Sequence, residues 1–169
     1  MDINGVDLSK LPQSELKVLA ARAIRLVQNP EKGIGTELFE ALLKIVPQAC
    51  VETVVVDDLN HPHRIYLTWR EDEHYRGWHC PGTYIRLGES FEDAIRRVLQ
   101  QEINVELRNF RSTKIQYSHV DSRGHTIGTV WLVQADGEPT GGKWLRVSQL
   151  PEPTLPHHVQ FIQEVLSKL

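Results

Sequence analysis

The sequence predicts an α/β fold, because β-branched strand segments alternate along the chain with amphipathic helices. Residues 51–56 form a valine-rich run that is typical of a central strand. Apolar and polar residues alternate over residues 64–70, as in a strand with one buried face. From Phe91 onward, apolar residues recur at helical spacing and define one helix face. A length of 169 residues suits one such domain.

Two helices are expected before the first strand, over residues 13–28 and from residue 36 to about residue 46. The first stops at Asn29-Pro30 and the second closes near Pro47. We therefore expect residues 1–48 to form a helical extension packed on a domain of residues 49–169. The two helices either cover an edge or face of the sheet, or they form a homodimer interface or close over a substrate.

The second half of the chain is expected to supply a hairpin and a closing helix. Residues 115–120 and 126–133 read as strands that flank a turn. Leu155-Pro156 opens the last helix, with proline in its first turn. Four histidines are expected in solvent, two in the turn before residue 64 and two at the start of the last helix: His61, His63, His157 and His158.

Composition points to an ordinary globular protein, with 40% hydrophobic and 24% charged residues. A net charge of -3 gives no general attraction to nucleic acid or to an anionic membrane. The sequence has no signal peptide and no apolar run long enough to span a bilayer, so a cytoplasmic protein is expected. Cys50 and Cys80 lack the close spacing of a reactive dithiol, and we expect buried free thiols.

The stretch from residue 78 to residue 107 is the most informative for function. Pro81-Gly82 and Gly88 mark a tight loop, and Ser90 with Asp93 makes a capping-box start to a helix. Glu102 falls on the apolar face of that helix. A carboxylate there is costly unless an arginine, a metal ion or water compensates it. The alternative is that the helix frays before this residue and leaves it in solvent.

This stretch resembles a Nudix box, the loop-and-helix signature of enzymes that hydrolyse nucleoside diphosphates linked to another group. Glu89 takes the first acidic position, Arg97 the arginine, Leu99 the apolar position and Glu102 the last clustered acid. The resemblance implies the Nudix fold, a mixed β-sheet sandwiched between helices (α/β/α). It also implies that Glu102, Arg97 and Glu89 are the catalytic group of the box.

The box departs from the family pattern at four positions: Thr83, Val98, Gln101 and Asn104 stand where the family has glycine, two glutamates and glycine. In the family, the glutamates bind divalent ions. The resemblance therefore implies weak binding of Mg²⁺ (or Mn²⁺) by Glu102, with Gly82 and Thr83 and with Glu138, an acid in a later loop. Glu89 and Arg97 are expected to form a supporting ion pair.

Substrate contacts are expected from Arg70, Tyr75 and Arg76, beside the box. A guanidinium at the end of the strand can hold a phosphate through two hydrogen bonds, although Arg70 could equally form a surface ion pair. His119 and His125 flank the hairpin turn, and one of them is a candidate general base unless both are merely exposed.

Two functions follow. The first is a Mg-dependent hydrolase of a nucleoside diphosphate derivative, a small molecule such as a nucleotide sugar. The box is similar to that of the GDP-mannose mannosyl hydrolases, but the loop at residues 138–142, where those enzymes place a histidine base, has none. The alternative is a catalytically silent Nudix domain that binds a nucleotide or a partner protein.

Overall fold

The computed structural model describes residues 2–3 and 6–169, with side chains from Asp7 onward, and divides into two units at Ile34. The first unit contains α1 (Gln13–Ile24), at the expected place but ending before Gln28. None of the residues of α1 is buried. The predicted role of the extension as a cover or a dimer interface stays a prediction. The short elements of this unit are β1 (Asp2–Ile3), β2 (Val6–Asp7), η1 (Leu8–Lys10) and η2 (Pro30–Lys32).

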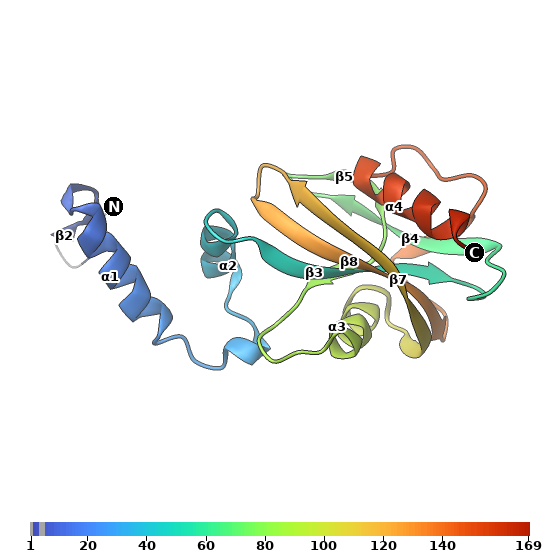
Figure 1. Ribbon diagram of the computed structural model, residues 1–169, viewed down its shortest axis with the longest axis horizontal. Coiled ribbons are helices and arrows are strands. Elements are labelled where there is room, and N and C mark those ends of the chain that lie inside the picture. Colours follow the sequence, from blue (N-terminus) through green and yellow to red (C-terminus); the bar gives the residue numbers. More distant parts are fainter. Residues whose placement is uncertain (1, 4–5) are drawn as a thin grey trace. The chain divides into compact units, whose positions relative to one another are not determined.

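The second unit, residues 35–169, contains every other predicted element (Figure 1). The hairpin strands run further than the sequence suggested, and the box helix continues through a π-turn. The elements are α2 (Thr36–Leu43), β3 (Gln48–Val56), β4 (Arg64–Glu71), β5 (Arg76–His79), β6 (Gly82–Tyr84), α3 (Phe91–Val98), η3 (Leu99–Ile103), β7 (Glu106–Val120), β8 (His125–Asp136), β9 (Gly142–Arg146) and α4 (Pro156–Ser167).

The strands of this fully described unit form one mixed seven-stranded sheet. Its main path runs β5-β4-β3-β8-β7, with β6 paired to β3 and β9 paired to β4. The pairing of β3 with β8 is parallel, whereas the other pairings are antiparallel. The central strand β3 therefore contacts both the return strand and the strand that leads into the box loop.

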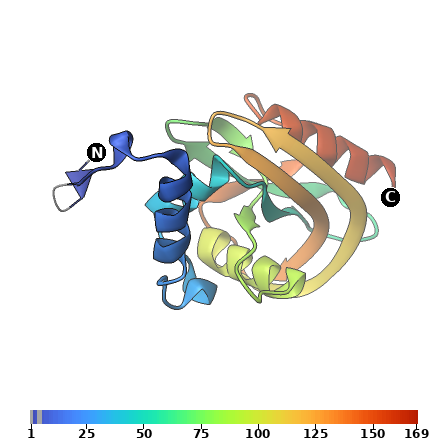
Figure 2. The same cartoon turned by 60° about the vertical axis from the view of Figure 1, so that its left-hand side comes forward.

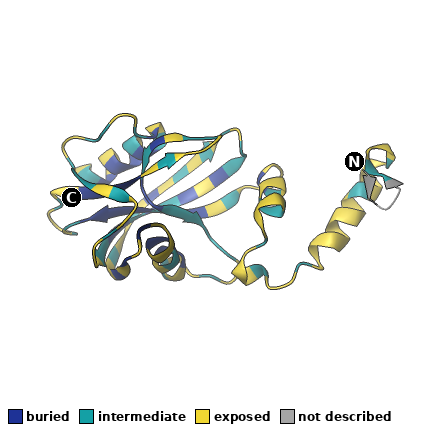
Figure 3. Ribbon diagram, turned by 180° about the vertical axis from the view of Figure 1, so that it is seen from behind, coloured by how far each residue is buried: buried dark blue, intermediate teal, exposed yellow. Residues whose placement is uncertain are grey.

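Helices cover both faces of the sheet, α3 on one side and α4 on the other (Figures 1 and 2). The side chains of β3 alternate between two apolar cores. Val54 and Val56 pack in the core with Phe161 and Ile162 of α4, and the valines on the other face pack with α3 and η3. Figure 3 shows these buried positions along the central strands. The fold is the predicted α/β/α sandwich.

The box helix begins at a complete capping box. The Ser90 hydroxyl accepts a hydrogen bond from the Asp93 amide at 3.1 Å, and the Asp93 carboxylate accepts one from the Ser90 amide. The helical course continues through Ile103 as a π-turn, so Glu102 does not lie on a frayed end. Asn104 then adopts the left-handed conformation, with φ 54°, that a terminal glycine usually supplies. Asparagine is tolerated there, which explains the loss of the glycine.

Replacing Ser90 with alanine should lower the free energy of unfolding by about 1 kcal/mol, because the Asp93 amide loses its acceptor. Urea denaturation of the two proteins measures this difference. A Ser148→Ala change, in an exposed turn, is the control. Equal stability of the wild type and Ser90→Ala would contradict the role of the cap.

No helix among the described residues is long and apolar enough to cross a bilayer.

Candidate functional site

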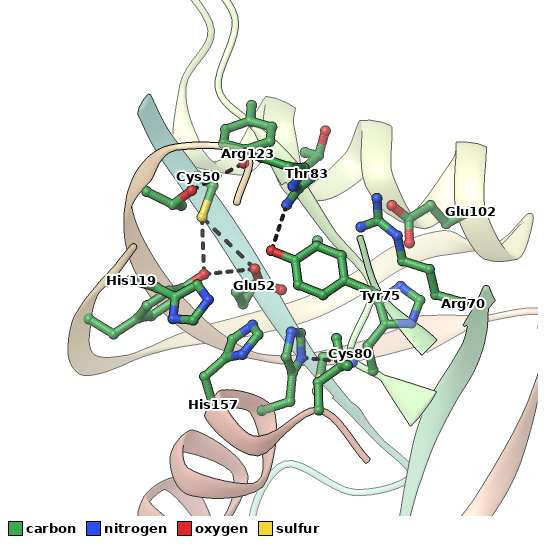
Figure 4. A pocket seen from close by; sticks show the side chains of 17 residues that line it. Cys50, Glu52, Arg70, Tyr75, Cys80, Thr83, Glu102, His119, Arg123 and His157 are labelled. Carbon is green, nitrogen blue, oxygen red and sulfur yellow. Dashed lines mark hydrogen bonds between the residues drawn. The ribbon is translucent and has the colours of Figure 1, made fainter. Parts of the chain in front are cut away.

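A pocket lies where the box loop, the central strand, the hairpin turn and the start of α4 meet (Figure 4). Its volume is about 80 Å³. This is well below the roughly 300–1,000 Å³ of a pocket that encloses a whole small-molecule ligand. The lining is mostly polar: Cys50, Glu52, Arg70, Tyr75, His79, Cys80, Gly82, Thr83, Tyr84, Glu102, Tyr117, His119, Arg123, Thr126, Leu155, His157 and His158.

The box arginine ties the loop to the helix. Arg97 donates to both oxygens of Glu89, at 2.7 Å and 2.8 Å, in a two-pronged ion pair. It also donates to the Thr83 hydroxyl and to the Tyr84 carbonyl, each at 2.9 Å. The side chains of Arg97 and Glu89 are only 15% and 11% exposed. This pair therefore fixes the loop segment that forms one wall of the pocket.

The Glu89–Arg97 pair should make the fold sensitive to acid. Hydrogen bonds from Arg97 lower the pKa of Glu89 below its ordinary value. The stability that this carboxylate contributes is therefore complete above the ordinary glutamate pKa and is lost as pH falls through the lower, folded value. The difference in unfolding free energy between wild type and Glu89→Gln should be positive at pH 7 and shrink towards about pH 3. Urea titrations across that range test it, and a constant difference would contradict it.

Glu102 lines the pocket, with Arg70 beside it (Figure 4). The residue is exposed, and it lines the pocket next to the Gly82-Thr83 segment. Desolvation of its carboxylate there raises the pKa of Glu102 to about 7, against the opposing effects of the Arg70 charge and of the Gly82 backbone. Glu102 thus lies on the pocket wall and keeps contact with solvent.

Glu52 is a second carboxylate in the pocket that the sequence reasoning missed. It follows Val51 in β3 and shares its face of the strand with Val54. Its Oε1 accepts a hydrogen bond from the Tyr117 hydroxyl at 2.8 Å, whereas Oε2 is buried without a hydrogen-bond partner. Burial raises the pKa of Glu52 to about 8, and the charge of Glu102 adds to this rise.

Two arginines lie against the ring of Tyr75. The guanidinium carbons of Arg70 and Arg123 are 4.9 Å and 4.6 Å from its centroid. Arg70 also forms an ion pair with Asp72 at 2.5 Å, so it both pairs at the surface and lines the pocket. Arg76 is exposed, pairs with Glu71 and is not among the lining residues. Arg123, from the hairpin turn, was not anticipated.

Helix α2 supports the hairpin turn that carries Arg123. The backbone of Gly124 packs so closely on the Leu43 carbonyl that an added Cβ would lie 2.1 Å from its oxygen. Lys44 donates a hydrogen bond to the Ser122 carbonyl. The ring of Phe39 contacts the ring of Tyr84 on the pocket wall, with centroids 4.6 Å apart. This helix therefore positions one side of the site.

The expectation that His157 and His158 lie in solvent is wrong. His158 is 4% exposed and accepts a hydrogen bond from the Cys80 amide at 3.1 Å. His157 is half-buried, and its ring stacks on that of His119, with centroids 4.3 Å apart. Burial lowers the pKa of His157 to about 4 and lowers the pKa of His158 well below its ordinary value, so neutral imidazoles line this wall. The physical reason is that the start of α4 faces the sheet.

Other predicted residues lie outside the pocket. His61 and His63 are exposed, as expected. His125 lies 2.8 Å from the Ser118 hydroxyl and is not among the lining residues, so His119 is the flanking histidine that faces the pocket. Glu138 is exposed and also outside the lining, although its loop packs on the box helix through a hydrogen bond from the Thr140 amide to the Ile103 carbonyl.

Both cysteines are buried free thiols, as expected, and both line the pocket. Burial raises the pKa of Cys50 to about 12, and it raises that of Cys80 as well. Neither thiol is a nucleophile at neutral pH, because the reactive form is the thiolate.

Whether the pocket can hold a metal ion depends on which side chains offer oxygen, nitrogen or sulfur ligands. Among residues 7–169, no group of three or more His, Cys, Asp or Glu side chains is arranged to hold a metal ion. Mg²⁺, however, is commonly held by one or two carboxylates together with substrate phosphates and water. The pocket offers Glu102 and the unpartnered oxygen of Glu52, and these donors fit such an ion.

Comparison with known proteins agrees with the fold. A family model described as the NUDIX domain matches residues 48–165. No curated protein sequence matches the chain. Among solved structures, a MutT NUDIX hydrolase from Burkholderia pseudomallei is 22% identical, with a TM-score of 0.62 over 71% of this chain and 98% of that chain. The ORF135 protein of E. coli is 18% identical, with a TM-score of 0.60 over 75% and 92% of the two chains. A MutT protein from Bacillus halodurans is 19% identical, with a TM-score of 0.58 over 70% and 82%. At these identities the structures support the fold alone.

Proposed function

The chain belongs to the Nudix family of hydrolases, and from that premise we propose that it hydrolyses a nucleoside diphosphate derivative with the help of Mg²⁺ or Mn²⁺. One observation carries the proposal: Glu102 shares a pocket with Arg70 and Arg123. A carboxylate suits a divalent cation, and guanidinium groups suit the phosphate oxygens that the cation would also contact.

The size of the pocket supports a substrate that enters only in part. A hollow of about 80 Å³ suits the diphosphate and leaves the nucleoside and the leaving group at its mouth. Such a site makes most of its contacts with the phosphates. A nucleotide sugar, with its sugar outside the hollow, fits this description.

Each residue then has a separate task. When bound, the divalent ion neutralises charge on the diphosphate and polarises its oxygens. Glu102 would hold the ion together with the Gly82-Thr83 segment, and Glu138, which lies outside the pocket lining, is the further ligand that the family resemblance implies. Arg70 orients the phosphates, and the Glu89–Arg97 pair keeps the loop in place. His119 is the candidate acceptor of the proton from the attacking water. Positioning and electrostatic stabilisation supply most of the rate.

A silent binding module is the second candidate, and one observation favours it. Val98, which replaces a family glutamate, is 1% exposed and packs in the core beneath α3. At this position the side chain contributes to the apolar core and cannot bind a metal ion. A domain that lost its remaining metal carboxylates would still bind a nucleotide through the arginines.

A substrate panel separates the two candidates. Purified full-length chain is incubated with nucleoside diphosphate derivatives, nucleotide sugars included, in Mg²⁺, Mn²⁺ or EDTA. Metal-dependent turnover supports the hydrolase. Thermal stabilisation by nucleotides without turnover would instead support the binding module. In water enriched in oxygen-18, label in the phosphate product indicates attack on phosphorus, and label in the sugar indicates attack on carbon.

A further inference from the structure

Glu52 has a buried carboxylate oxygen that lacks a hydrogen-bond partner. The residue is half-buried, but Oε2 itself is enclosed and makes no hydrogen bond. The Tyr117 hydroxyl donates a hydrogen bond to the other carboxylate oxygen, Oε1, at 2.8 Å. An enclosed carboxylate oxygen without a partner is costly, and such oxygens usually find a donor or a cation.

Gly82 brings the oxygen of Glu52 close to Glu102. Residues 52 and 82 are opposite each other on β3 and β6. A Cβ at position 82 would lie 2.1 Å from Glu52 Oε2, so only glycine leaves room for the carboxylate there. Glu102 lines the same pocket as Gly82 and Glu52, and the Gly82 backbone lowers the pKa of its carboxyl group. Glu52 from the sheet and Glu102 from the box helix therefore both lie on the pocket wall that Gly82 helps to form.

We propose that Glu52 and Glu102 together bind one divalent cation beside Gly82. Glu52, which lies outside the Nudix box, would thereby supply a carboxylate in place of those missing at Val98 and Gln101. This inference rests on the proposed function, because the cation it places is the one that contacts the diphosphate.

The surroundings favour a cation over an arginine as the partner of Glu52. Arg70 is engaged with Asp72 and with the ring of Tyr75. Arg123 lies against the same ring, and neither arginine donates to Glu52 Oε2. A small hard ion held by two carboxylates and completed by water and phosphate oxygens would give this oxygen the partner that it lacks.

Mn²⁺ binding to the full chain tests the proposal without any turnover, because the paramagnetic resonance signal of free aqueous Mn²⁺ falls when the ion binds. Titrations use Mn²⁺ alone and Mn²⁺ with α,β-methylene-ADP, which is not hydrolysed at the bridging position. The variants are Glu52→Gln, Glu102→Gln and Gly82→Ala, and the last keeps both charges while displacing the Glu52 carboxylate. Glu106→Gln, on an exposed part of β7, is the matched control. Circular dichroism without metal shows which variants fold.

Glu52→Gln should weaken Mn²⁺ binding by about tenfold or more, as should Glu102→Gln. Gly82→Ala should also weaken it, and Glu106→Gln should leave it unchanged. The double Glu52→Gln, Glu102→Gln variant should lose less than the product of the two single losses, because both residues hold the same ion. Unchanged binding in folded Glu52→Gln, or no Mn²⁺ binding by the wild type, would overturn the inference. If the substrate panel shows turnover but Glu52→Gln binds Mn²⁺ as tightly as the wild type, only this inference is overturned. If Mn²⁺ binding depends on Glu52 but the panel shows no turnover, only the hydrolase proposal is overturned.

Discussion

Glu102→Gln should lower kcat/KM for the diphosphate substrate on the order of a hundredfold to a thousandfold, with the fold retained. Glutamine keeps the size of the side chain but removes the charge proposed to hold the cation against the phosphates. The variant also removes the charge that adds to the effect of burial in raising the pKa of Glu52, so the pocket itself should not lose stability. Steady-state kinetics over a range of Mg²⁺ concentrations measures the effect.

The Mg²⁺ series separates a lost ligand from a general defect. If Glu102 holds the ion, the variant needs more Mg²⁺ for half-maximal rate and stays slow at saturation. Glu106→Gln, an acid-to-amide change outside the pocket, should match wild type at every concentration. Wild-type turnover in Glu102→Gln would place the cation elsewhere and would remove the central support of the proposed function.

The elements of the fold could be predicted because local pattern and tertiary packing agree. The valine-rich run at residues 51–56 lies within β3, and the capping box at Ser90 begins α3. The ion pair between Glu89 and Arg97 is the one that the resemblance to the Nudix box implies, and both residues lie within one loop and helix. These features depend on residues that are close in sequence, so one sequence is enough to place them.

Two site residues left a signal that the sequence reasoning did not use. Glu52 shares the period-two face of Val54, so a charge was placed on a core-facing side of a central strand. His158 lies three residues before Phe161 and four before Ile162, which puts it on the buried face of α4. In both cases the period of the strand or helix, rather than the polar character of the side chain, indicates that the residue lies on the buried face.

The place of Arg123 could not be found from sequence. The length and curvature of the β7–β8 ladder depend on two register shifts, after Leu107 and after Ser112. The turn is then held by α2, through contacts that join residues far apart in the chain. Neither the register shifts nor these contacts produce a local sequence pattern. The position of the Arg123 guanidinium in the pocket therefore depends on the tertiary fold.

Arg123→Gln should raise KM and lower kcat/KM by roughly thirtyfold, equivalent to about 2 kcal/mol. The Nε of Arg123 is buried without a hydrogen-bond partner, although the side chain donates to the Tyr75 hydroxyl at 3.1 Å. If the pocket accepts phosphate, as proposed, this guanidinium has a donor free to bind an anionic oxygen. Glutamine removes both the charge and this donor.

The comparison of Arg123→Lys with Arg123→Gln identifies which property of the side chain is used. Lysine keeps the charge but lacks the planar fork, so it should restore only part of kcat/KM if the phosphate is held through two hydrogen bonds. Arg108→Gln, an exposed arginine change on β7, should leave the kinetics unchanged. Arg123 also stacks on Tyr75, and a change that only loosened the hairpin would lower the unfolding midpoint and affect Lys and Gln variants alike. If kcat/KM falls in the order wild type, Arg123→Lys, Arg123→Gln while the unfolding midpoints stay equal, Arg123 contacts the substrate directly. A loss of packing alone would not separate a planar guanidinium from a lysine ammonium in this way.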